Sequence, residues 1–146
     1  MDPVASHLEP LVWALASTRG RVLELGGGGY STGVIAGFAR SGRECWTVET
    51  NPEWARALTE LYGEAVRIVD EEPWLEWGVV LVDNAPGAAR APAIRRHLGS
   101  AWIVVHDTEP EVAMFYPGMA EAIAEARTIR TFKYREPLPW TTILLP

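Results

Sequence analysis

Acidic side chains lie at or directly after the ends of five short apolar runs of this 146-residue sequence, and one of these runs also ends in a histidine. An ionised carboxylate only accepts hydrogen bonds, and histidine changes its charge near neutral pH. Such side chains can bind hydroxyl and amine groups, and they can take a proton from a reacting group. In chain order the residues are Glu24, Glu49, Asp70, Asp83 and the pair His106–Asp107.

The segment 22–33, VLELGGGGYSTG, joins an apolar run to a glycine-rich turn and then to a predicted helix. Glycine lets the backbone come close to a ligand at the N-terminus of that helix. The dinucleotide pattern G-x-G-x-x-G is absent, because it requires glycine at Ser31 or at Thr32. Glu24, two residues before the first glycine, would also repel a pyrophosphate. The turn therefore favours a ligand other than a dinucleotide.

The five apolar runs predict parallel strands buried on both faces, because they lack the alternation of a half-exposed strand. They cover residues 21–25, 44–49, 65–70, 77–83 and 101–106. Helices are expected between them, with N-caps at Ser31 or Thr32 and at Asn51. The predicted helices run from about 4 to 17, from 31 or 32 to about 40, from 52 to the residue before Gly63, and from 92 to 98.

After the fifth strand, Pro117 and Gly118 break the chain, and residues 119–126 predict another helix. Two further strands, 130–136 and 140–145, flank Pro137 and Pro139. A connection this short cannot carry a parallel crossover, so these strands should form an antiparallel hairpin. We therefore predict one α/β domain over residues 1–146, with a doubly wound, mostly parallel seven-stranded sheet and helices on both faces. The carboxyl ends of its parallel strands should hold the ligand.

VLELGGG resembles motif I of the class I S-adenosylmethionine-dependent methyltransferases, and the resemblance extends from about Arg21 to the C-terminal hairpin. It implies that the glycine turn passes under the methionine part of the cofactor and that Glu24 is the motif acid. It also implies that Glu49 accepts hydrogen bonds from the ribose hydroxyls and that Asp70 contacts adenine. Tyr30 stands where the family often has a third glycine. The residues assigned to S-adenosylmethionine are Glu24, Gly26, Gly27, Gly28, Tyr30, Ser31, Glu49, Thr50, Asp70, Glu71 and Asp83.

Methyl transfer is an in-line displacement, so the protein must align the acceptor, exclude water and, for a hydroxyl acceptor, remove a proton. His106, Asp107 and Asp83 are the catalytic candidates. The alternative is that His106 is a hydrogen-bonded strand-end residue and that Asp107 begins the next turn. A divalent ion on Asp83, Asp107 and Glu109 is a further alternative. We assign no metal ligands, because three acids on loops are more often solvated.

The remaining polar and aromatic residues have structural interpretations. We expect His7 and His97 on helix surfaces, and Cys45 in the core. Trp74, Trp77 and Trp140 are expected to pack, although Trp74 could border an adenine pocket. The arginines Arg90, Arg95 and Arg96 are expected to face solvent.

Thirteen Lys and Arg against nineteen Asp and Glu give a net charge of −6, which disfavours a nucleic-acid partner. No apolar stretch is long enough to span a bilayer, and the N-terminus lacks a secretory pattern, so we expect a cytoplasmic protein without a membrane partner. The single cysteine excludes an intrachain disulfide.

The sequence thus predicts a methyltransferase that acts on a small molecule, at oxygen. The signature of nucleic-acid amino methyltransferases, Asn or Asp before Pro-Pro and an aromatic residue, is absent, because Asp83 is followed by Asn-Ala-Pro. The short segment before the first strand leaves little chain for a substrate lid. It therefore suggests either a homodimer, with exposed aromatics such as Phe115 and Tyr116 at the interface, or a non-catalytic cofactor-binding module of a larger assembly. A nucleotide- or NAD-binding Rossmann protein is the third interpretation, which the absent fingerprint disfavours.

Overall fold

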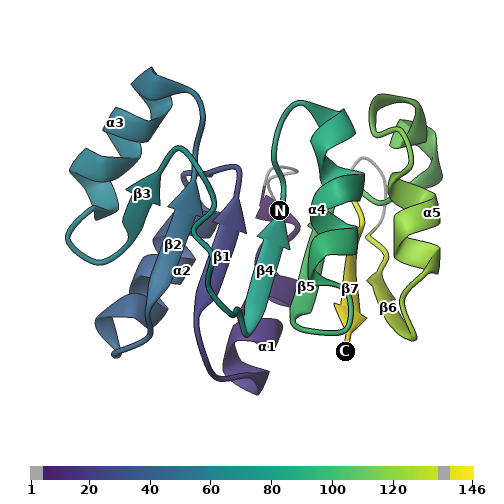
Figure 1. Ribbon diagram of the computed structural model, residues 1–146, viewed down its shortest axis with the longest axis horizontal. Coiled ribbons are helices and arrows are strands. Elements are labelled where there is room, and N and C mark those ends of the chain that lie inside the picture. Colours follow the sequence, from purple (N-terminus) through teal and green to yellow (C-terminus); the bar gives the residue numbers. More distant parts are fainter. Residues whose placement is uncertain (1–4, 135–138) are drawn as a thin grey trace.

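Seven strands form one sheet in the computed structural model, which describes residues 5–134 and 139–146 (Figure 1). Their order is β3-β2-β1-β4-β5-β7-β6; β1 to β5 are parallel, and β7 runs antiparallel between β5 and β6. This confirms the doubly wound, mostly parallel sheet and its C-terminal hairpin. The strands are β1 (Val22–Leu25), β2 (Cys45–Val48), β3 (Arg67–Val69), β4 (Val79–Val82), β5 (Trp102–His106), β6 (Thr128–Phe132) and β7 (Thr141–Leu145).

Helices cover both faces of the sheet. In Figure 1, α4 and α5 lie in front of the sheet, whereas α1 and α2 lie behind it. The α-helices are α1 (Leu8–Ser17), α2 (Ser31–Arg40), α3 (Pro52–Tyr62), α4 (Arg90–His97) and α5 (Met119–Ala124). Short 3-10 helices, η2 (Gly87–Ala89) and η3 (Pro110–Phe115), follow β4 and β5.

Successive residues of the central strands supply the two apolar cores between these layers. Leu23 and Val80 pack with α4 and α5, whereas their neighbours Val22 and Leu81 pack with α1 and α2. Both β1 and β4 are buried along their whole length. This arrangement is the physical reason for the continuous apolar runs, because side chains alternate between two covered faces. Cys45 lies in the second core, as predicted.

The helix boundaries differ from prediction in small ways. Asn51 caps α3 as expected, since its side chain accepts from the Glu53 and Trp54 amides at 3.0 and 3.1 Å. The predicted cap of α2 is wrong: Tyr30 occupies the N-cap position, and the Thr32 hydroxyl donates to Glu24 instead. The helix predicted over 92–98 begins two residues earlier and ends at His97, and α5 ends at Ala124.

Parts of three predicted elements lie outside the described residues. They are the start of the first helix at Val4, the end of the strand predicted over 130–136, and the connection at Pro137. Of the rest, α1 begins at Leu8, and β6 begins at Thr128 instead of residue 130.

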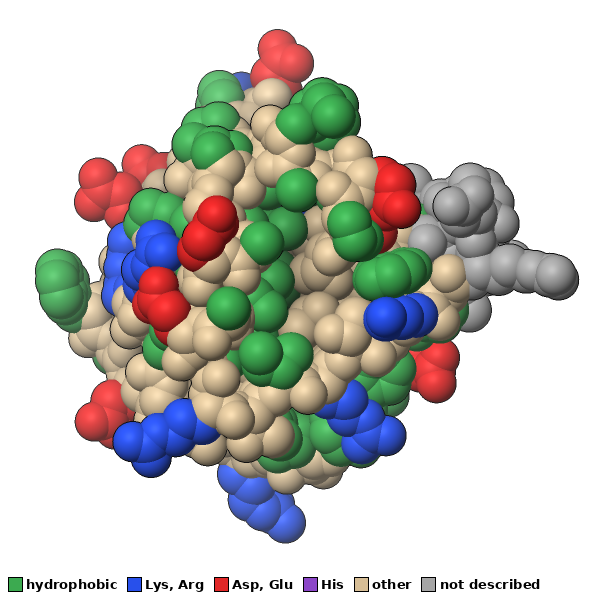
Figure 2. Space-filling model, turned by 90° about the vertical axis from the view of Figure 1, so that its right-hand side faces the viewer, with side chains coloured by type: hydrophobic (Ala, Val, Ile, Leu, Met, Phe, Trp, Pro, Cys, Tyr) green, Lys and Arg blue, Asp and Glu red, His purple; other side chains and the backbone are tan. Residues whose placement is uncertain are grey.

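The strand β6 forms one edge of the sheet and is exposed along most of its length. Figure 2 views this side of the molecule, where charged side chains of both signs surround a band of hydrophobic side chains. Charged residues on an edge strand discourage pairing with other chains. Among residues 5–134 and 139–146, no helix is long and apolar enough to cross a membrane.

The glycine turn after β1 packs directly against the end of β4. Gly26 has φ +86°, and a Cβ built on it would lie 2.6 Å from the Asp83 carbonyl oxygen. The turn therefore requires glycine at this position, both for the left-handed backbone and for the close approach.

We expect Gly26→Ala to lower the free energy of unfolding by more than about 1 kcal/mol, because the methyl group meets backbone atoms that cannot move freely. Gly37→Ala is the matched control. Gly37 lies inside α2, and a Cβ there meets nothing within 4 Å, so alanine should stabilise the helix by about 0.5–1 kcal/mol. Urea unfolding of both variants tests the assignment, and equal effects would contradict it.

Candidate functional site

A cavity of about 350 Å³ opens at the carboxyl ends of β1, β2 and β4. From β1 the chain adds β2 and β3 on one side and then returns to add β4 on the other side, so this is the switch point at which open α/β sheets bind ligands. The cavity is lined by Leu25, Gly26, Gly27, Val48, Glu49, Thr50, Asn51, Asp83, Asn84 and Ala85.

The Glu49 carboxylate is held in the wall of this cavity. Its Oε2 accepts from the Gly27 amide at 3.1 Å, and its Oε1 accepts from the Asn51 amide at 2.8 Å. The Trp54 indole donates to the Gly27 carbonyl at 2.6 Å, a contact that the sequence analysis missed. The glycine turn and the N-terminus of α3 thus orient a carboxylate that still has lone pairs for a ligand.

Glu24 lies beneath the turn, and it does not line the cavity. Its Oε2 accepts from the Thr32 and Thr47 hydroxyls at 2.7 and 2.6 Å, and Thr32 in turn accepts from the Gly28 amide. Burial raises the pKa of Glu24 to about 7, although these hydroxyl bonds act in the opposite direction. Glu24 therefore supports the turn from below.

The other residues assigned to the cofactor divide into two groups. Gly26, Gly27, Thr50 and Asp83 line the cavity with Glu49. Gly28, Tyr30 and Ser31 belong to the turn and the start of α2, whereas Asp70 and Glu71 are exposed after β3 and are not among the lining residues.

Arg90, the first residue of α4, joins the ends of β4 and β5. Its guanidinium is buried and donates to Asp83 Oδ1 at 2.8 Å and to Asp107 Oδ2 at 3.4 Å. It also donates to the carbonyls of Asn84 and His106 and lies 4.1 Å from the centre of the Tyr116 ring.

The prediction that Arg90 faces solvent is therefore wrong, although Arg95 and Arg96 are exposed and pair with Glu125 and Glu72. The physical reason is that Arg90 begins α4 beside the carboxylates of Asp83 and Asp107. The sequence of three nearby arginines does not indicate which arginine lies beside a carboxylate.

Both carboxylates beside Arg90 have defined partners. Burial tends to raise the pKa of Asp83, but the hydrogen bond and charge of His106, together with Arg90, hold it below its ordinary value. The Tyr116 hydroxyl donates to Asp107 Oδ2 at 2.8 Å, and burial together with this bond raises the pKa of Tyr116 to about 12. Tyr116 is thus a protonated donor packed on Arg90, unlike the exposed aromatic residue that was predicted; Phe115 is exposed as predicted.

His106 is buried behind the cavity wall. Its Nδ1 lies 3.3 Å from Asp83 Oδ1 and 3.5 Å from Asp107 Oδ1, and its Nε2 lies 3.2 Å from Ser6 Oγ. The three catalytic candidates therefore form one cluster, of which Asp83 also lines the cavity.

His7 packs edge-to-face against His106, with ring centres 4.5 Å apart. Burial is the main cause that lowers the pKa of His7 to about 4, so the imidazole is neutral. The prediction of a surface position is wrong for His7, because α1 packs on β5 and β7 and so places its N-cap over the end of β5. It is also wrong for His97, which is buried 3.1 Å from Glu72.

The tryptophan predictions are partly correct. Trp77 is buried in the core, as expected, whereas Trp74 is fully exposed and does not pack. Trp140 is half-buried, and its amide donates to Glu109 Oε2 at 2.9 Å. This hydrogen bond holds Glu109 at Trp140. Among the described residues, Asp83, Asp107 and Glu109, the alternative metal ligands, do not form a group that could hold an ion. The group there that could hold an ion is His7, Asp83 and His106.

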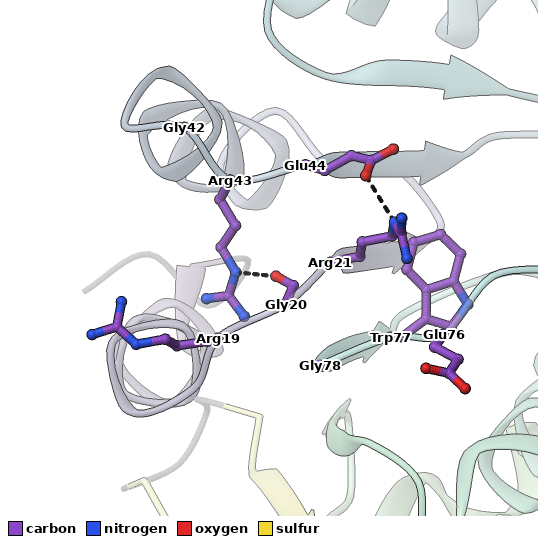
Figure 3. Close-up of a pocket in the computed structure, with 9 residues that line it drawn as sticks. All are labelled: Arg19, Gly20, Arg21, Gly42, Arg43, Glu44, Glu76, Trp77 and Gly78. Atoms are coloured by element: carbon purple, nitrogen blue, oxygen red, sulfur yellow. Dashed lines mark hydrogen bonds and ion pairs between the residues drawn. The ribbon is translucent and has the colours of Figure 1, made fainter.

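Larger cavities lie elsewhere. One of about 530 Å³ lies at the amino ends of the strands (Figure 3). Figure 3 shows Arg43 directed at the Gly20 carbonyl and Arg21 directed at Glu44. Another, of about 840 Å³, lies between Glu72–Trp77 and the C-terminal end of α4. In the first of these cavities, the arginines form hydrogen bonds within the protein. The cavity at the carboxyl ends of the strands is therefore the candidate ligand site.

Solved methyltransferases share this architecture. An O-methyltransferase from Bacillus cereus, in complex with SAH, matches 99% of this chain and 82% of its own, with a TM-score of 0.66 and 17% identity. The N-methyltransferase NodS from Bradyrhizobium japonicum WM9 matches 99% of this chain and 98% of its own, with a TM-score of 0.71 and 10% identity. Cofactor-bound Rv0187 from MTB matches 94% of this chain and 78% of its own, with a TM-score of 0.66 and 21% identity.

No protein-family model matches the sequence, and no curated protein matches it. At identities this low the structural likeness defines the fold alone. The chain has the class I methyltransferase fold, as the strand order and the resemblance of motif I predicted.

We expect Glu24→Gln to change how stability depends on pH. The native carboxyl keeps its proton up to about pH 7, whereas in the unfolded chain it ionises near 4.5. The native state therefore binds more protons in this interval, so the free energy of unfolding falls as the pH rises from 4.5 to 7. Glutamine cannot ionise, so the unfolding free energy of the variant relative to wild type should rise by about 3 kcal/mol across the interval.

Urea unfolding at pH 4.5 and pH 8 measures this difference, with Glu53→Gln, an exposed residue of α3, as the control. A constant difference for Glu24→Gln would mean that the native carboxyl ionises at its ordinary pKa.

Proposed function

We propose that this protein binds S-adenosylmethionine and transfers its methyl group to an oxygen of a small molecule. The observation that carries the proposal is the Glu49 carboxylate, which is fixed beside the glycine turn at the switch point of this fold. Ribose hydroxyls are donors, and an oriented carboxylate is a strong acceptor for them.

The charge of the cavity supports the same ligand. Glu49 and Asp83 both line it, so it suits a sulfonium cation with an attached ammonium group better than it suits a pyrophosphate. The Bacillus cereus neighbour, solved with SAH, supports the same cofactor. In this proposal the glycine turn contacts the methionine part, and Asp70 and Glu71 meet the adenine from the loop after β3.

For the chemical step, we assign proton removal to the cluster of Asp83, His106 and Asp107. The acceptor oxygen attacks the methyl carbon, the carbon–sulfur bond breaks, and S-adenosylhomocysteine leaves as a neutral thioether. The hydroxyl proton passes to the Asp83–His106 pair, whose groups lie 3.3 Å apart. Asp107 and Arg90 hold this pair in place and balance its charge.

The preference for a small oxygen acceptor rests on two features. The end of β4 reads Asp83-Asn84-Ala85-Pro86, without the paired prolines typical of enzymes that methylate amino groups of nucleic-acid bases. Met114 and Phe115, which are 80% and 63% exposed in η3, follow the cluster and offer apolar surface to an aromatic acceptor or to a partner chain.

Glu49→Ala should weaken S-adenosylhomocysteine binding, because two charge-assisted hydrogen bonds are lost, each worth roughly 1.5–3 kcal/mol at most. Calorimetry measures the change. Glu53→Ala, two residues into α3 and exposed, is the control and should bind as wild type does. NAD binding tighter than S-adenosylhomocysteine, or wild-type affinity in Glu49→Ala, would overturn the cofactor assignment.

His106→Ala and Asp107→Asn should lower turnover by roughly 10²–10⁴-fold while S-adenosylhomocysteine affinity is retained, because they alter proton removal and leave the cofactor wall intact. Methyl transfer to a panel of phenols and alcohols measures turnover. His97→Gln, which alters a histidine paired with Glu72 away from the cluster, is the control. If the wild-type protein binds the cofactor but methylates none of the panel, a non-catalytic binding module is the better description.

A further inference from the structure

The His7 imidazole is buried without a hydrogen-bond partner. The residue is 3% exposed, and within residues 5–134 and 139–146 neither Nδ1 nor Nε2 has a partner. Buried polar atoms in native proteins are nearly always paired, and an exception calls for an explanation such as a bound ion. The ring packs against His106, and one of its nitrogens lies within 4.8 Å of ligand atoms of Asp83 and His106, at the ends of β4 and β5.

We propose that His7, Asp83 and His106 bind a divalent transition-metal ion. One ligand atom from each of the three residues lies within 4.8 Å of the others. Ligand atoms on a common ion are at most about 4.4 Å apart, because each lies roughly 2.0–2.2 Å from it. Small side-chain rotations are therefore enough to close the site around an ion.

The ligand types select the class of metal. Two imidazole nitrogens and one carboxylate oxygen suit Fe²⁺, Zn²⁺ or Mn²⁺, whereas Mg²⁺ prefers a set made of oxygen atoms alone. Two histidines and one carboxylate also leave coordination positions open for a substrate oxygen.

A hydrogen bond with Ser6 orients the His106 ring for metal binding. The Ser6 Oγ lies 3.2 Å from His106 Nε2, and a proton on Nε2 can be donated to it. Nδ1, which faces Asp83, is then the nitrogen with a free lone pair. Histidines that bind metals commonly donate their second N–H to an oxygen, which fixes the tautomer and the orientation of the ring.

The charges of the cluster also favour a cation. Asp83 and Asp107 carry two negative charges, and the buried Arg90 supplies one positive charge. With neutral imidazoles, one negative charge remains at the ends of β4 and β5. Arg90 and His106 both approach Oδ1 of Asp83, so the carboxylate is already oriented toward the histidine.

A bound ion would lie between Asp83 and His106, where the proposed methyl transfer places the proton taken from the acceptor. Because Asp83 also lines the cavity, the ion could hold an acceptor hydroxyl and lower its pKa, a role that rests on the proposed methyl transfer. Metal binding itself does not rest on that proposal, and it can be measured without cofactor or acceptor.

The test uses the full chain after treatment with a chelator and titrates it with Zn²⁺ by calorimetry. One equivalent should bind, and Mg²⁺ should bind at least tenfold more weakly. His7→Phe fills the same buried space without nitrogen ligands and should bind Zn²⁺ at least about 100-fold more weakly. His97→Gln is the matched control, because it removes the third histidine of the chain, and it should bind as wild type does.

Co²⁺ provides a second measurement that does not depend on the variants folding. Its visible absorption bands on wild type should indicate mixed nitrogen and oxygen coordination, and added Zn²⁺ should abolish them. The proposal is overturned if wild type binds no stoichiometric Zn²⁺, if folded His7→Phe binds it as wild type does, or if His97→Gln loses it equally. Mg²⁺ binding as tight as Zn²⁺ binding would indicate an oxygen-only site instead.

Discussion

The buried guanidinium of Arg90 is the interaction on which the polar end of this sheet depends. It brings together Asp83 after β4, Asp107 after β5 and the first turn of α4, and it is stacked on Tyr116. Two half-buried carboxylates so close together would repel each other without a cation between them. Arg90 is stable in the interior because carboxylate and carbonyl oxygens accept from its three nitrogens.

A second constraint acts on the other side of the switch point. The glycine turn is fixed from below by Glu24 through Thr32, and from the side by the backbone of Asp83 against Gly26. Glu49 then binds the turn through Gly27. Asp83 thus belongs to both halves of the site, since its backbone touches the turn and its side chain pairs with Arg90 and His106. The cavity and the polar cluster share one wall at this residue.

The strands and helices that are recognised by the spacing of their apolar side chains were predictable from the sequence. Strands such as 77–83 were predicted to within two residues, because burial on both faces leaves an uninterrupted apolar run. The position of Glu49 followed from its place at a strand end. The burial of Arg90 and His7 was not predictable, because it depends on which helix faces which strand end. Nothing in the sequence around His7 distinguishes a surface helix cap from one that covers β5.

The place of β7 has a consequence for the order in which the chain acquires structure. β6 contacts the sheet through β7, which is made later and pairs with β5 on its other side. As the chain emerges during synthesis, the hydrogen-bonding edge of β5 therefore stays open, with His106 at its end, until the last strand arrives. The strand β7 inserts between two strands that are made before it. Until then the nascent chain exposes an unpaired strand edge, to which a chaperone or another nascent chain can bind.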